Sequence, residues 1–145
     1  MNPNDVAAIL AKCAAYDNRT PAQATVAAWT EALEDMPVAD ALKFVADHYA
    51  QSREWIMPAD LNIAWKRIRT ERQRAISEAE RPQPPQDATT EQFLAFRRGV
   101  TNAISRGQPV NELQAAGYAA IGRPVPVIEP TTNRVINLDQ IGQPA

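Results

Sequence analysis

A run of basic residues in the middle of the chain has the clearest chemical character. Residues 66–74 contain one acid and five bases, namely Lys66, Arg67, Arg69, Arg72 and Arg74. At about 100° per residue, a helix through this run places Arg72 in line with the apolar side and the other bases opposite it. A charged residue at a core position predicts that the helix end projects from its neighbours. We expect the run to contact nucleic acid or an acidic partner, with a solvated helix end as the alternative.

No grouping of side chains indicates catalysis. The five glycines lack the Gly-x-x-x-x-Gly-Lys spacing, which excludes a P-loop ATPase. Glu31, Glu34 and Asp35 are typical of a solvated helix face. His48 lies near the end of a predicted helix, and no nucleophile is evident beside it. Because Cys13 falls on an apolar stripe, we expect it to be a buried core residue. The sequence predicts a protein that is not an enzyme.

Composition excludes several classes of protein. The chain has 145 residues, 45% of them apolar, and a formal net charge of −2, which excludes a wholly disordered chain and a general DNA-coating protein. One cysteine and one histidine are too few soft ligands for a zinc or iron–sulfur site, so we expect no metal and no cofactor. The apolar run from Val6 to Ala11 stops at Lys12, which predicts neither a signal peptide nor a membrane span. We expect a cytoplasmic protein without a membrane partner.

Helical periodicity dominates the first half of the chain. Apolar residues recur at intervals of three and four within residues 4–16, and three further helix starts follow. These starts are marked by Thr20 with Pro21, by Pro37, and by Met57 and Pro58 with Asp60. Residues 1–76 show no sustained alternation of period two. We therefore predict an all-α fold, with a compact four-helix bundle over residues 1–76 that packs about Trp29, Trp55 and Trp65.

The second half is predicted to be less compact. Residues 77–90 contain three prolines and no large apolar side chain, which is linker composition. Thr89 or Thr90 then caps a helix that Gly107 ends, and another helical piece completes a segment over residues 91–122. Its apolar stripes are narrow, so we expect this segment to dock on the bundle or on a partner. Residues 123–145 read as an extended tail punctuated by prolines, in which residues 125–138 allow a small hairpin.

The order of helix starts and core positions over residues 4–70 resembles a known family. The residues that carry the resemblance are Trp29, Leu33, Pro37, Ala41, His48, Tyr49, Pro58 and Leu61. They are similar in arrangement to the small phage-encoded loaders and inhibitors of the replicative hexameric helicase. The resemblance implies a phage DNA-replication accessory protein in the host cytoplasm, which binds a DnaB-type helicase and loads or inhibits it without ATPase activity. It also admits an origin-binding protein or DNA as a further partner through residues 66–74.

The resemblance further implies which part of the chain contacts the helicase. In proteins of this kind a helical N-terminal domain precedes a flexible C-terminal region that binds the helicase. By analogy, the predicted contact residues are Phe93, Phe96, Val100, Ile104, Leu113 and Tyr118. A partly ordered segment of this kind orders on binding and releases readily.

Two other classes of protein remain open from the sequence. One is a small DNA-binding transcriptional regulator, in which residues 37–74 form a helix-turn-helix variant. Against it, Asp40 and Asp47 accompany Lys43 on the polar side of the predicted third helix, which suits a polyanion poorly. The other class is a virion assembly protein.

Overall fold

The structure is a computed structural model that describes residues 1–126, and all regular secondary structure in this part of the chain is helical, without strands. The elements in chain order are α1 (Pro3–Asp17), α2 (Gln23–Ala32), α3 (Val38–Gln51), α4 (Pro58–Ala75), the 3-10 turn η1 (Glu78–Glu80), α5 (Thr90–Ser105) and α6 (Val110–Ala120). The all-α prediction is confirmed. Most of the predicted tail over residues 123–145, and with it the predicted hairpin over 125–138, lies outside the described residues.

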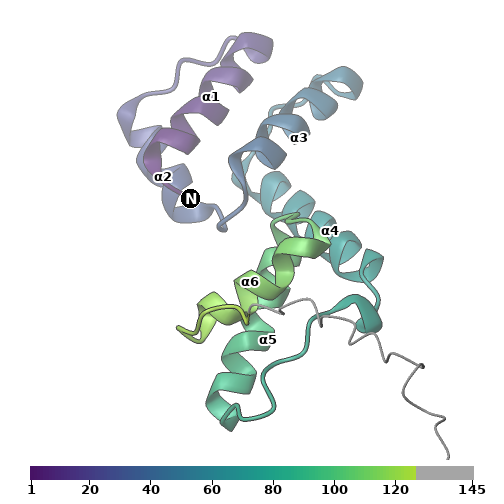
Figure 1. Cartoon of the computed structure of the whole chain (residues 1–145). Helices are drawn as coiled ribbons and strands as arrows, with labels where there is room; N and C mark the ends of the chain where they lie inside the picture. Colours follow the sequence, from purple (N-terminus) through teal and green to yellow (C-terminus); the bar gives the residue numbers. More distant parts are fainter. Residues whose placement is uncertain (127–145) are drawn as a thin grey trace, which may run out of the picture.

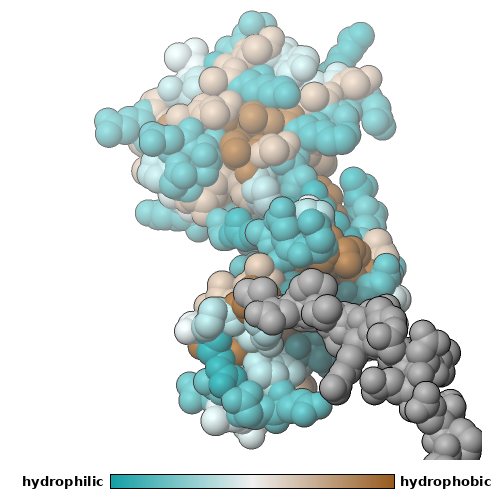
Figure 2. All heavy atoms as spheres, viewed as in Figure 1, coloured by the Kyte–Doolittle hydropathy of each residue, from teal (hydrophilic) through white to brown (hydrophobic). Residues whose placement is uncertain are grey.

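The helices form two units joined through α4 (Figure 1). Helices α1 to α3 lie at one end, α5 and α6 lie side by side at the other, and α4 runs between them. Two separate groups of buried apolar residues correspond to this division. Figure 2 shows hydrophilic residues over much of the visible face, and hydrophilic and hydrophobic residues side by side in the narrow region between the two units.

The core of the N-terminal unit lies where helices α1 to α4 pack together. Its buried residues are Val6, Ile9, Leu10, Cys13, Trp29, Leu33, Met36, Ala41, Val45, Ile56, Leu61 and Trp65. The core therefore contains two of the three tryptophans. The expectation that the bundle also packs about Trp55 is wrong, because this residue lies in the loop between α3 and α4 with 59% of its surface exposed.

Side-chain capping explains where α4 and α5 begin. Asp60 accepts a hydrogen bond from the backbone N–H of Met57, 2.8 Å away, at the start of α4. At the start of α5, Thr89 and Gln92 each accept from the other's backbone N–H at 3.2 Å. These predicted starts are confirmed. The predicted start at Thr20 is wrong, since α2 begins at Gln23 without a side-chain cap.

The second unit is a hairpin of α5 and α6 with a core of its own. Phe96 and Tyr118 pack edge to face, with ring centroids 5.5 Å apart. The helices approach closely at two glycines. A Cβ built on Gly117 would lie 2.5 Å from the Phe96 ring, and one on Gly99 would lie 2.6 Å from the Ala120 Cβ. Glycine at 117 thus allows the ring to pack on the backbone, which offsets its low helix propensity.

Polar contacts hold residues 77–90 against the helices. Glu78 accepts a hydrogen bond of 2.6 Å from Arg97 on α5, and Arg81 donates one of 2.8 Å to the carbonyl of Gln73 on α4. Further along, Asp87 pairs with Arg123 at 2.6 Å. The segment predicted as a linker is therefore held by side-chain contacts to α4, to α5 and to Arg123 after α6.

Candidate functional site

Arg72, the base that falls in line with the apolar stripe of α4, joins the two units. Its guanidinium donates to both carboxylate oxygens of Asp40 on α3, at 2.7 and 2.8 Å, and to the carbonyl of Ser105 on α5, at 2.9 Å. The same group lies beside Gly107, which adopts φ +77° after α5. The prediction that this end of the helix projects from its neighbours is wrong, because Arg72 is bonded on two sides within the protein.

The other predicted bases lie on the surface, and most of them face acids. Lys66 and Arg69 lie 3.7 and 3.3 Å from the carboxylate of Glu34, and Arg67 lies 3.9 Å from Glu71. Pairs between exposed groups of this kind contribute little to stability. Arg74 is exposed and has no ion pair with any residue in the described range 1–126.

Beside this surface, α4 and α5 form a concave region that we call the α4–α5 groove. Two adjoining hollows of about 430 and 440 Å³ share Thr101 and Ser105. The groove is lined by Arg69, Thr70, Gln73 and Arg74 from α4 and by Leu94, Arg97, Arg98, Thr101, Asn102 and Ser105 from α5. At its floor the amide of Gln73 donates to the Thr101 carbonyl at 2.7 Å and to the Ser105 hydroxyl at 3.0 Å.

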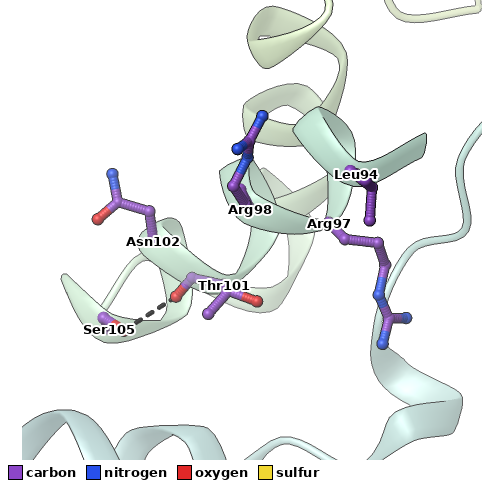
Figure 3. Close-up of a pocket in the computed structure, with 6 residues that line it drawn as sticks. All are labelled: Leu94, Arg97, Arg98, Thr101, Asn102 and Ser105. Atoms are coloured by element: carbon purple, nitrogen blue, oxygen red, sulfur yellow. Dashed lines mark hydrogen bonds between the residues drawn. The ribbon is translucent and has the colours of Figure 1, made fainter. Parts of the chain in front are cut away.

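Figure 3 shows how the α5 side of the groove is arranged. The guanidinium groups of Arg97 and Arg98 point away from each other, and Thr101 and Ser105 lie one helical turn apart. The Ser105 hydroxyl donates to the Thr101 carbonyl at 2.9 Å. The contribution of α5 to this basic surface was missed in the sequence, because Arg97 and Arg98 lie far along the chain from residues 66–74.

Most of the predicted helicase-contact residues lie in a core and not on the surface, where they were expected. Phe96, Val100, Ile104, Leu113 and Tyr118 are all buried and form the core of the α5–α6 hairpin. The remaining one, Phe93, is 44% exposed. Five of the six side chains therefore stabilise the hairpin in this structure and are not available on its surface, since each helix covers the apolar stripe of the other.

A second surface surrounds Arg19, which sequence reasoning did not single out. Arg19 and Asp17 form an ion pair in which both side chains are more than nine-tenths buried. Arg19 also donates to the carbonyl of Ile56 at 3.1 Å and to the hydroxyl of Tyr49 at 3.1 Å. Hydrogen bonding from the Arg19 guanidinium, with a smaller contribution from the Tyr49 hydroxyl, lowers the pKa of Asp17 to about 2 against the opposing effect of burial. This pair fixes the chain between α1 and α2.

Aromatic side chains enclose the Arg19 guanidinium on its outer side. Its central carbon lies 4.9 Å from the Trp55 ring centroid and 5.6 Å from that of Trp29. The hollow beside it, which we call the Trp55 hollow, has a volume of about 330 Å³ and is lined by Arg19, Thr20, Pro21, Thr25, Trp29, Trp55 and Met57. Thr20 and Pro21 thus line a surface rather than start a helix.

The remaining candidates for chemistry have structural contacts. His48 lies 2.8 Å through its Nε2 from the carbonyl of Glu54. Cys13 is fully buried, and burial raises the pKa of its thiol. Among residues 1–126, no three His, Cys, Asp or Glu side chains come together as a metal site. None of the helices in this range has the length and apolar character needed to cross a bilayer.

No family model, curated protein or solved structure matches this chain. Its function is therefore inferred from the residues of the α4–α5 groove and the Trp55 hollow.

Proposed function

We propose that this chain is a phage DNA-replication accessory protein, which binds a DnaB-type replicative helicase and loads or inhibits it without hydrolysing ATP. The residues that carry the resemblance to such proteins lie together in one unit. Trp29, Leu33, Ala41 and Leu61 are buried in the same core. Tyr49 packs against that core from α3. The resemblance thus concerns one packed body rather than scattered positions, which supports the proposal.

The Trp55 hollow is the observation that carries the binding role. Trp55 and Met57 are 59% and 54% exposed at its rim. Tryptophan contributes disproportionately to protein interfaces, because it buries a large rigid surface when a partner covers it. The bonds from Arg19 to Asp17 and Ile56 hold the guanidinium under the Trp55 ring. A partner would therefore meet a preorganised surface and lose little side-chain entropy there.

This arrangement moves the proposed contact from the second unit to the first. The resemblance implies contacts after the linker, yet those side chains are the core of the α5–α6 hairpin. Of that set, Phe93 alone is exposed. We therefore assign the helicase contact to the Trp55 hollow, and Phe93 provides an exposed aromatic control in the other unit.

The test is size-exclusion chromatography with light scattering, in which the full chain is mixed with the hexameric helicase of the host bacterium. The wild-type chain is expected to co-elute with the helicase. Trp55→Ala should weaken the complex by about 30-fold, the change that follows from an interface hot spot of about 2 kcal/mol. Phe93→Ala, the matched control, should bind as the wild type does.

The two ways in which this experiment can fail are distinct. Absence of a complex with the wild-type chain at micromolar concentrations would overturn the proposed function. A complex that Phe93→Ala weakens and Trp55→Ala does not would keep the function and transfer the contact to α5. ATPase measurements on the complex would then separate loading from inhibition.

A further inference from the structure

The α4–α5 groove has the composition of a surface for polyanions. Four of its ten lining residues are arginines and none is an acid, although the whole chain has a formal net charge of −2. The other polar side chains of the groove are hydroxyls and amides, namely Thr70, Gln73, Thr101, Asn102 and Ser105. Arginine together with Ser, Thr, Asn and Gln is the set that proteins use against phosphate oxygens.

Two arginines are available for such contacts. Arg74 from α4 and Arg98 from α5 are exposed, and neither has an ion pair within residues 1–126. The other two are partly neutralised at the rim, since Arg69 pairs with Glu34 at 3.3 Å and Arg97 with Glu78 at 2.6 Å. Because Arg74 and Arg98 line different hollows of the groove, a ligand that meets both must extend across the two.

We propose that the α4–α5 groove binds the phosphate backbone of duplex DNA. No aromatic side chain lines the groove, so it lacks the stacking surfaces that proteins use to hold the bases of a single strand. The donors of Thr70, Gln73 and Ser105 are already bonded inside the protein. The arginines, with the Thr101 hydroxyl and the Asn102 amide, instead suit phosphates, whose spacing is independent of base sequence. This inference concerns a different surface from the Trp55 hollow and does not depend on helicase binding.

The groove also differs from the DNA-contacting element that the sequence suggested. Arg72 is excluded from it by its bonds to Asp40 and to the Ser105 carbonyl. These bonds hold α4 against α3 and α5. Arg74 lines the hollow between α4 and α5, and Arg98 lines the adjoining hollow on α5, which shares Thr101 and Ser105 with the first. The cations that act on DNA are therefore the four arginines of the groove, two of them unpaired within residues 1–126, rather than the whole run 66–74.

Fluorescence anisotropy with a labelled duplex of about 20 base pairs tests the proposal. At 50 mM NaCl the full chain should bind in the micromolar range, and affinity should fall with salt with a slope of up to about −3.6 for four phosphate contacts. The double variant Arg74→Gln/Arg98→Gln should bind at least about 10-fold more weakly. Its salt slope should be smaller by about 1.8, because each lost phosphate contact removes about 0.9.

The matched control changes net charge equally at another place. Lys43 and Arg53 are exposed on α3 and in the α3–α4 loop, and Lys43→Gln/Arg53→Gln should retain the wild-type salt slope. The proposal is overturned if the wild-type chain does not bind duplex at 50 mM NaCl. It is equally overturned if the control variant loses as much affinity as the groove variant, or if oligo-dT binds more tightly than duplex. If the wild-type chain binds no duplex but forms a complex with an acidic protein, and the groove variant loses that complex, the groove binds a protein instead.

Discussion

The two units of this protein stabilise their cores in different ways. The N-terminal unit buries twelve residues contributed by four helices and their loops, and adds a buried ion pair between Asp17 and Arg19. The α5–α6 hairpin buries six residues and depends on close approach of the helices at Gly99 and Gly117. A two-helix unit has few neighbours to cover its apolar stripes, so docking on α4 supplies part of its stability. We expect the hairpin to open at a lower free energy than the bundle.

The largest expected effect is the loss of Trp29 from the bundle. Trp29→Ala should lower the free energy of unfolding by about 3–5 kcal/mol, because a large buried aromatic side chain leaves a cavity in the core. Urea unfolding followed by far-ultraviolet circular dichroism measures this change. Trp55→Ala is the matched control and should cost less than about 1 kcal/mol, since the exposed ring contributes only its stacking on Arg19. Equal losses in the two variants would contradict the assigned core.

Loss of Phe96 should reveal whether the hairpin is a separate unit. Phe96→Ala removes a fully buried ring that packs on Gly117, at a local cost of about 3 kcal/mol. Amide hydrogen exchange should show faster exchange throughout α5 and α6, whereas α1 to α3 keep their protection. Phe93→Ala, the exposed neighbour, should leave both patterns unchanged. Uniform loss of protection across all helices would show that the two units unfold as one.

The smallest expected effect is a pH dependence of the stability of the N-terminal unit. The α5–α6 hairpin should not share it, because the Asp17–Arg19 pair lies in the N-terminal unit alone. The pKa of Asp17 is lowered to about 2 from 3.8, so the unfolded chain binds the proton more readily than the folded chain. The pair therefore contributes fully above pH 3.8, and its contribution falls as pH decreases through about 2. This contribution is about 2.5 kcal/mol, from a shift of about 1.8 pKa units at about 1.4 kcal/mol for each unit.

Unfolding free energies between pH 5 and pH 2 measure this contribution. The difference between the wild type and Asp17→Asn should be largest near pH 5 and should shrink towards pH 2. Asp47→Asn replaces an exposed acid paired with Lys43 and should differ little from the wild type at every pH. A difference for Asp17→Asn that stays constant down to pH 2 would show that the carboxylate is not stabilised by folding.

Sequence patterns predicted the elements better than the surfaces. The starts of α3, α4 and α5 follow from signals within a few residues, as the bond from Met57 N–H to Asp60 illustrates. The predicted start at Thr20 failed because a distant contact prevails there. Arg19 is held by Ile56 and Tyr49 from α3 and the following loop, and the chain at Thr20 lines the Trp55 hollow.

The candidate sites were predicted only in part. The basic character of residues 66–74 was evident, but the partner of Arg72 is Asp40, which lies 32 residues earlier. The apolar stripe of α5 was also evident, yet its burial depends on α6, and periodicity alone does not distinguish a helix that packs within the chain from one that packs on another protein.

By itself, the sequence determined the all-α class, the positions of most helix starts and most of the residues that face apolar surroundings. These depend on local backbone preferences and on periodicity, which act over one or two helical turns. The tertiary structure alone decided that Arg72 joins the two units, that Trp55 is exposed above Arg19, and that α5 contributes arginines to the groove beside α4. Each of these outcomes requires a partner far along the chain, and packing rather than local preference selects that partner.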